Sequence, residues 1–119
     1  MPESFAITPE VVLEFHAIAT AGEPDPDKLP GVFRDRDNFV GVAGLILYQP
    51  PSWSLVPGLV AEMCDEINRR SEAGPLNVAA YALWRLNWIH PFGDGNGKTA
   101  RAVMYLVRCV GFGRMLLSF

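Results

Sequence analysis

The sequence contains few cysteines, no excess of positive charge and no internal repeat or low-complexity tract. Its 119 residues include two cysteines, Cys64 and Cys109, and neither the Cys-x-x-Cys spacing nor a Cys/His metal spacing occurs. We expect both thiols to be buried and reduced. The formal net charge of −3 provides no overall attraction for nucleic acid, so a nucleic-acid partner is not expected.

Long hydrophobic runs are missing as well. No apolar segment approaches the roughly 18 residues of a membrane span, and the acidic start of the chain (residues 1–4) lacks the apolar core of a signal peptide. We therefore expect a cytoplasmic protein without membrane contact. Half of the residues are hydrophobic, and this composition with this length predicts one globular domain over residues 1–119.

Hydrophobic residues recur mostly at helical spacing, which predicts a mainly α fold. Helices are expected over residues 11–21, 57–70, 77–89 and 97–110. Thr8 and Pro9 fit the N-cap and first position of the first helix, and Gly111 is expected to end the last one. The third helix is apolar almost all round, which predicts a central, buried position. The apolar residues after Gly113 either pack back on the bundle, or a further C-terminal helix is missing.

Residues 31–48 have a different character and predict a short β-hairpin or extended flap. Residues 32–34 and 39–42 look strand-like, residues 45–48 follow them, and adjacent prolines in 49–52 stop the extended segment. The predicted architecture is a small helical bundle with a short β-hairpin flap.

Residues 90–101 concentrate chemically useful groups between two predicted helices. A loop at a helix N-terminus binds anions because its first N–H groups have no intrahelical partner. His90 suits a general base at neutral pH, and Asp94 suits Mg²⁺ that is shared with ligand phosphates. The remaining groups are Gly93, Gly95, Gly97, Asn96, Lys98 and Arg101. The glycines permit positive φ and a close approach to an anion, and the cations are expected to project toward the same ligand.

Two other site types share parts of this segment but differ in spacing. Residues 97–99 match the end of a phosphate-binding P-loop, but Phe92 occupies the first glycine position and a helix, not a strand, precedes it. Residues 94–96 begin like a calcium loop, but Lys98 replaces an oxygen ligand and no glutamate closes the loop. We instead interpret Phe92 as an anchor of the loop to the core.

The run from His90 to Arg101 resembles the signature of the Fic domain family, His-Pro-Phe-x-(Asp/Glu)-Gly-Asn-Gly-(Arg/Lys)-x-x-Arg. Lys98 stands where arginine is usual. Further similarities are the pair Phe15-His16, residues 31–34 and residues 48–51, so that the resemblance covers about residues 8–117. It implies a Fic-type helical bundle with a hairpin flap.

The resemblance also implies a protein adenylyltransferase, which transfers AMP from ATP to a Ser, Thr or Tyr hydroxyl of a target protein and releases pyrophosphate. ATP and Mg²⁺ are the implied co-substrate and metal. The implied catalytic residues are His90, Asn96 and Arg101, the metal ligand is Asp94, and the nucleotide-binding residues are Gly93, Gly95, Asn96, Gly97, Lys98 and Arg101. Because lysine lacks the planar fork of arginine, we expect phosphate binding at Lys98 to be weaker by about 1–2 kcal/mol.

Partners follow from the same resemblance. The flap (about residues 36–48) is expected to bind the target segment as an added strand. The inhibitory pattern (Ser/Thr)-x-x-x-Glu-(Gly/Asn) of many family members is absent from this sequence, so inhibition is expected from a separate antitoxin or inhibitory helix. Three alternatives stay open: a Doc-like protein kinase, another nucleotide donor, and a catalytically silent Fic-fold binding module.

Overall fold

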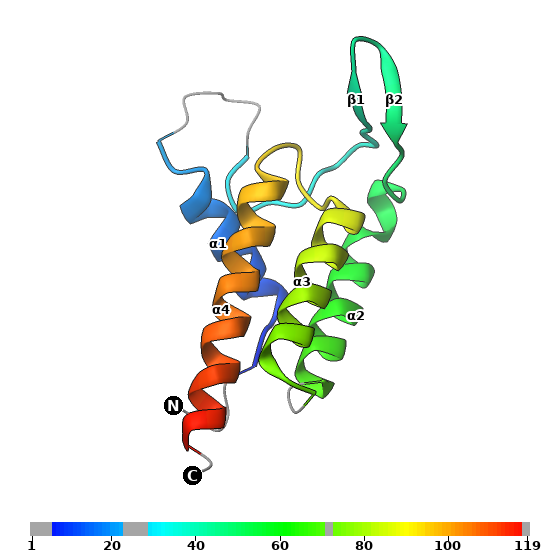
Figure 1. Cartoon of the computed structure of the whole chain (residues 1–119). Helices are drawn as coiled ribbons and strands as arrows, with labels where there is room; N and C mark the ends of the chain where they lie inside the picture. The colour runs from blue at the N-terminus through cyan, green and yellow to red at the C-terminus, as the bar shows by residue number, and fades with distance from the viewer. Residues whose placement is uncertain (1–5, 23–28, 71–72, 118–119) are drawn as a thin grey trace.

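A computed structural model describes residues 6–22, 29–70 and 73–117, with side chains described as far as residue 111. Within these ranges the chain forms four α-helices and one antiparallel hairpin (Figure 1), which confirms the predicted fold class. The elements are α1 (Pro9–Ala19), β1 (Val40–Val42), β2 (Leu45–Tyr48), a 3-10 helix (Trp53–Leu55), α2 (Val56–Arg69), α3 (Pro75–Ile89) and α4 (Asn96–Leu117).

The helices form a bundle in which α3 packs against both α2 and α4, and α1 crosses behind α4 (Figure 1). The predicted apolar stripe of α2 is buried as expected, with Val60 and Met63 fully inside the core. The N-terminus of α1 also agrees with the sequence, because Thr8 Oγ1 accepts a hydrogen bond from the Val11 N–H at 3.3 Å. The bundle therefore provides a rigid support for the loop between α3 and α4.

Two predictions about the last two helices were wrong. Helix α4 does not end at Gly111 but continues to Leu117. A Cβ at Gly111 would lie 2.9 Å from the Pro75 Cβ, so this glycine allows α4 to approach the start of α3 closely. Helix α3 is not buried all round, since Leu76 is 63% and Trp84 56% exposed. Its outer face has no cover within the described part of the chain.

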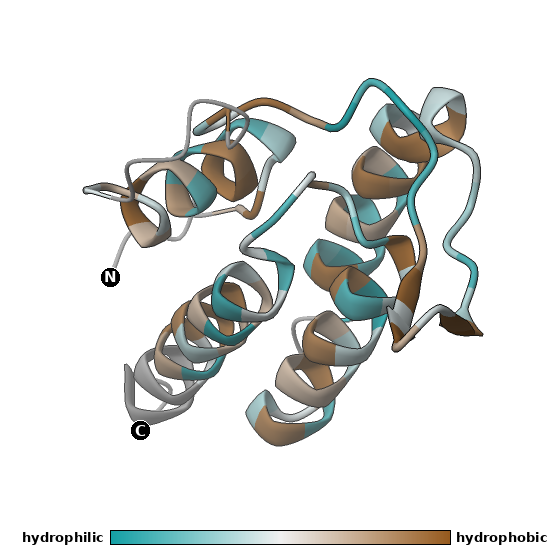
Figure 2. Ribbon diagram, turned by 90° about the horizontal axis from the view of Figure 1, so that it is seen from above, coloured by the Kyte–Doolittle hydropathy of each residue, from teal (hydrophilic) through white to brown (hydrophobic). Residues whose placement is uncertain are grey.

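The flap is shorter than the sequence predicted. Residues 32–34 form no strand, and the hairpin begins only at Val40. Instead of pairing with a strand, Arg34 donates its backbone N–H to the Pro91 carbonyl oxygen at 2.9 Å. The hairpin turns at Ala43 and Gly44, both with positive φ, as two-residue hairpin turns require. It projects beyond the bundle (Figure 1) and carries the hydrophobic colour in Figure 2.

The environments of the two cysteines differ, which corrects the expectation that both are buried. Cys64 lies in the core on α2, whereas Cys109 is exposed on α4. The apolar spacing of α4 did not distinguish the covered face of that helix from its open face. Among the described residues, no helix is both long and apolar enough to cross a membrane.

This difference predicts that one thiol reacts in the native protein. Burial, with smaller contributions from Asp65 and Glu10, raises the pKa of Cys64 to about 12, so it holds almost no thiolate near neutral pH. Ellman's reagent should therefore titrate Cys109 quickly and Cys64 only after denaturation. The Cys109→Ser variant should lose the fast reaction. Two equally fast thiols in the native protein would contradict the described packing of α2.

Candidate active site

The site is built on the turn that follows α3. His90 caps this helix in the left-handed conformation (φ 52°), and its N–H donates to the Leu86 carbonyl oxygen at 2.9 Å. Such a backbone conformation is unfavourable for a residue with a Cβ and persists only where its surroundings fix it. The imidazole of His90 is thus carried by a sharp, constrained turn rather than by a loose loop.

Arg34 fixes this turn from the side. Its side chain is 1% exposed. Its Nε donates to the His90 carbonyl oxygen at 2.7 Å, and its Nη2 donates to those of Pro51 at 2.6 Å and Ile89 at 3.3 Å. The last carbonyls of a helix lack intrahelical donors and carry partial negative charge, so a buried cation is stabilised there.

The same arrangement affects the charge of the candidate base. Burial lowers the pKa of His90, the positive charge of Arg34 lowers it further, and the carboxylate of Asp94 acts in the opposite direction. His90 is therefore mostly neutral at pH 7, which is the form that can accept a proton.

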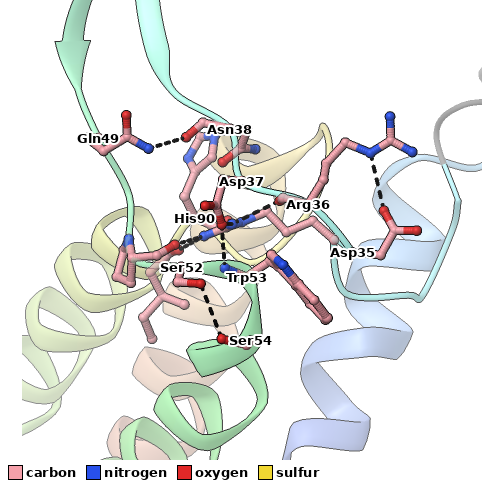
Figure 3. Close-up of polar contacts among 12 residues, drawn as sticks. Asp35, Arg36, Asp37, Asn38, Gln49, Ser52, Trp53, Ser54 and His90 are labelled. Atoms are coloured by element: carbon pink, nitrogen blue, oxygen red, sulfur yellow. Dashed lines mark hydrogen bonds and ion pairs between the residues drawn. The ribbon is translucent and has the colours of Figure 1, made fainter.

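The base of the flap is tied to this turn by further hydrogen bonds. Tyr48 donates its hydroxyl to the Trp88 carbonyl oxygen at 2.6 Å. Asp37 accepts a hydrogen bond from the Trp53 N–H at 2.8 Å (Figure 3), and it lies 3.9 Å from Nη1 of Arg34, whose Nε binds the His90 carbonyl oxygen. The hairpin and the candidate base thus share one anchoring region.

The loop after His90 is held to the core by Phe92 and Asn96. Phe92 is fully buried, as predicted, and its ring stacks on His16 of α1 with centroids 3.7 Å apart. Asn96 is 6% exposed, and its amide forms two 2.8 Å hydrogen bonds to the backbone N–H and C=O of Phe92. The Asn96 side chain therefore closes the loop by binding the backbone of Phe92.

Only one of the three glycines in the loop adopts positive φ. Gly95 has φ 77°, and a Cβ there would lie 2.7 Å from Thr20 Cγ2. Gly93 has no neighbour within 4 Å of such a position. A Cβ at Gly97 would lie 3.2 Å from Nη1 of Arg101, so the guanidinium of Arg101 folds back toward the start of α4. The expectation that all three glycines permit positive φ holds for Gly95 alone.

The start of α4 is therefore an electropositive region. The helix begins at Asn96, and its first N–H groups have no acceptor inside the helix. Lys98 and Arg101 are exposed on its first turns, and the Arg101 guanidinium adds its charge near these N–H groups. This arrangement can bind phosphate groups.

Asp94 is the residue of the loop that could hold a metal ion together with a ligand. Asp94 is exposed, and one of its carboxylate oxygens accepts a hydrogen bond from the Gly95 N–H at 2.8 Å. No cluster of three or more acidic, His or Cys side chains that could hold a metal occurs among the described residues. One carboxylate with ligand phosphates and water is a usual environment for Mg²⁺.

Two buried residues that support the site were not among the predicted site residues. These are His16, which stacks on Phe92, and Arg34, which binds the end of α3. The sequence places them 74 and 56 residues from His90, respectively. Both lie in segments that share the family resemblance, which was an available signal, but their hydrogen bonds go to backbone atoms that spacing does not reveal.

Comparison with known proteins identifies the family of this site. Residues 6–107 match the model of the Fic/DOC family. The chain belongs to the Fic/DOC family. Over 108 residues it is 35% identical to "Protein adenylyltransferase Fic" of Drosophila persimilis, covering 86% of this chain and 19% of that protein. Over 107 residues it is 33% identical to "Protein adenylyltransferase fic-1" of Caenorhabditis briggsae, covering 88% and 20%.

Solved structures of the family have the same architecture. A Fic domain containing signaling protein from Bacteroides thetaiotaomicron matches with a TM-score of 0.75 and 26% identity, over 87% of this chain and 39% of that one. Fic-1 (residues 134–508) from C. elegans matches with a TM-score of 0.69 and 28% identity, over 89% and 30%. This Fic chain spans about a fifth of the length of these curated relatives.

Replacing Gly95 should destabilise the Fic fold, whereas replacing Gly93 should not. Gly95→Ala forces a side chain into positive φ and against Thr20, which should cost about 1–3 kcal/mol of unfolding free energy. Gly93→Ala is the matched control and should cost about 0.5 kcal/mol or less. Urea unfolding of the three proteins measures both values, and equal losses would contradict the described loop.

The pKa of His90 should respond to the charge of Asp94. NMR titration should place this pKa below its ordinary value of about 6.5. In Asp94→Asn it should fall further, because a negative charge that favours the protonated ring is removed. Asp35→Asn, also at an exposed aspartate, is the control and should leave the titration unchanged. A higher pKa in Asp94→Asn would contradict the described electrostatics.

Proposed function

We propose that this chain transfers AMP from ATP to a Ser, Thr or Tyr hydroxyl of a target protein. The observation that carries the proposal is the placement of a neutral, half-buried histidine one short loop before an electropositive helix start. The base for a hydroxyl and the start of the helix that would bind phosphates lie within the seven residues from His90 to Asn96. The relatives named adenylyltransferase support the same reaction class.

The proposed reaction uses the charge state of each group. The neutral ring of His90 accepts the proton of the target hydroxyl, whose oxygen forms a bond to the α-phosphorus of ATP. The bond from that phosphorus to the bridging oxygen breaks, and pyrophosphate leaves. The N–H groups at the start of α4, together with Lys98 and Arg101, stabilise the charge that develops on the phosphate oxygens.

Mg²⁺ would neutralise phosphate charge when it is bound with the nucleotide. Asp94 is the residue that would hold it, because its exposed carboxylate lies in the loop immediately before α4. The protein's own contribution is to keep this carboxylate and the helix start in a fixed relation.

The hairpin is the proposed docking element for the target. It projects from the bundle (Figure 1), and its hydrophobic residues are exposed, among them Val42 at 67% and Leu45 at 65%. A target segment that adds a strand would pair with its backbone and cover part of these side chains. Inhibition by an antitoxin or inhibitory helix remains a further prediction of the family membership.

Paired labelling of a cell lysate tests the proposed function. The purified chain should label a protein from α-labelled ATP and not from γ-labelled ATP. His90→Ala should abolish the label. Asn87→Ala, at an exposed position on the last turn of α3, should retain it.

The other outcomes separate the alternatives. Label from the γ-position that depends on His90 would identify a kinase instead. The absence of label from both ATP preparations, with other labelled nucleoside triphosphates tested in parallel, would identify either another donor or a silent binding module. Both results would contradict AMP transfer from ATP.

A further inference from the structure

We propose that His16 is a positioning residue for the catalytic loop. Its ring orients a single peptide unit, the one between Asp94 and Gly95, and thereby sets the direction of the Asp94 carboxylate. This inference rests on the proposed function for its activity test, but its structural part can be tested without any activity.

The contacts of His16 join two segments that are distant in the sequence. His16 is 2% exposed, and its Nδ1 accepts a hydrogen bond from the Gly31 N–H at 3.0 Å. Its Nε2 lies 2.8 Å from the Asp94 carbonyl oxygen. The ring is stacked on Phe92 with an interplanar angle of 5°, so it cannot rotate without losing this packing.

These partners determine the form of the ring. A backbone N–H can only donate, so Nδ1 of His16 must carry a lone pair. The Asp94 carbonyl oxygen can only accept, so Nε2 must carry the proton. His16 is therefore the neutral Nε2–H tautomer, fixed by its two backbone partners.

One peptide unit transmits this constraint to the site. The oxygen of the Asp94–Gly95 peptide accepts from His16, and the N–H of the same peptide donates to the Asp94 carboxylate at 2.8 Å. Rotation of this peptide would therefore move a hydrogen-bond donor of the carboxylate as well. Gly95 has φ 77°, and glycine resists such a rotation less than other residues do. A donor that holds the peptide oxygen, such as His16, prevents the rotation.

Two conservative variants separate the hydrogen bonds of His16 to Gly31 and to Asp94. In His16→Gln the side-chain amide can reach the position of Nε2 and donate to Asp94, but it offers nothing at the position of Nδ1. In His16→Asn the amide oxygen can accept from Gly31 at the position of Nδ1, but no donor reaches Asp94. Both variants lose the stacking on Phe92, so a general packing effect should be similar in the two.

The variants should differ in activity more than in stability. His16→Asn should lower kcat about tenfold or more and raise the Mg²⁺ concentration needed for half-maximal labelling, because the carboxylate is misplaced. His16→Gln should stay within about threefold of the parent in kcat. Unfolding in urea should be similar for both. Equal kcat losses, or a larger loss in His16→Gln, would overturn the proposal.

An NMR measurement tests the structural part independently. The chain has two histidines, so in His90→Ala the remaining imidazole signals belong to His16. Long-range ¹H–¹⁵N spectra should show a protonated Nε2 and an unprotonated Nδ1 near pH 7.5, and the opposite tautomer would overturn the inference. If the parent protein labels no target while this tautomer is present, the proposed function fails and the described role of the ring in the loop stands.

Discussion

The site depends on a buried cation at the C-terminal end of α3. Burial of Arg34 removes water from its guanidinium and lowers the pKa of that group, although the nearby Asp37 acts in the opposite direction. Carbonyl oxygens compensate this cost, including those of Ile89 and His90 at the helix end. The guanidinium also binds the carbonyl oxygen of Pro51, so it connects the helix end to the segment that follows the hairpin.

This connection explains how His90 remains in a left-handed conformation and stays neutral. The hydrogen bond from Arg34 to the His90 carbonyl oxygen holds the strained peptide in place, and the same charge opposes protonation of the ring. One buried residue thus supports both the geometry and the charge state of the candidate base. His16 and Asn96 act in a comparable way on the rest of the loop, since each binds backbone atoms rather than the side chains exposed to a ligand.

The sequence predicted the parts of the structure that depend on local patterns. The N-cap at Thr8 and the apolar stripe of α2 follow from spacing and residue type. The parts that failed depend on contacts between distant segments. Gly111 resembles a helix stop, but its role is set by Pro75 on another helix, and Trp84 is apolar but nothing in the described chain covers it.

In the candidate site, too, the features that depend on local sequence were predicted and those that depend on distant contacts were not. The composition of the loop indicated phosphate chemistry, and the motif indicated the family before any contact was known. Which glycine needs positive φ was not predictable, because Gly95 is constrained by Thr20, the residue that follows α1. The closing role of the Asn96 side chain was missed for a similar reason, since an asparagine next to glycines fits a ligand contact and a loop clamp equally well.

The residues that hold the loop differ in kind from the lysine at position 98. The interactions that fix the loop come from His16, Arg34 and Asn96, and their partners there are backbone atoms. The hydrogen bonds at these positions require a particular direction and length, so a change of side chain there should alter the backbone conformation of the loop. Lys98 is exposed on the first turn of α4. In the proposed function the requirement at that position is positive charge near phosphates, which lysine meets with less directional contact than arginine. The segment from His90 to Arg101 therefore combines a buried side chain that closes the loop, Asn96, with an exposed charged side chain at its helical end, Lys98.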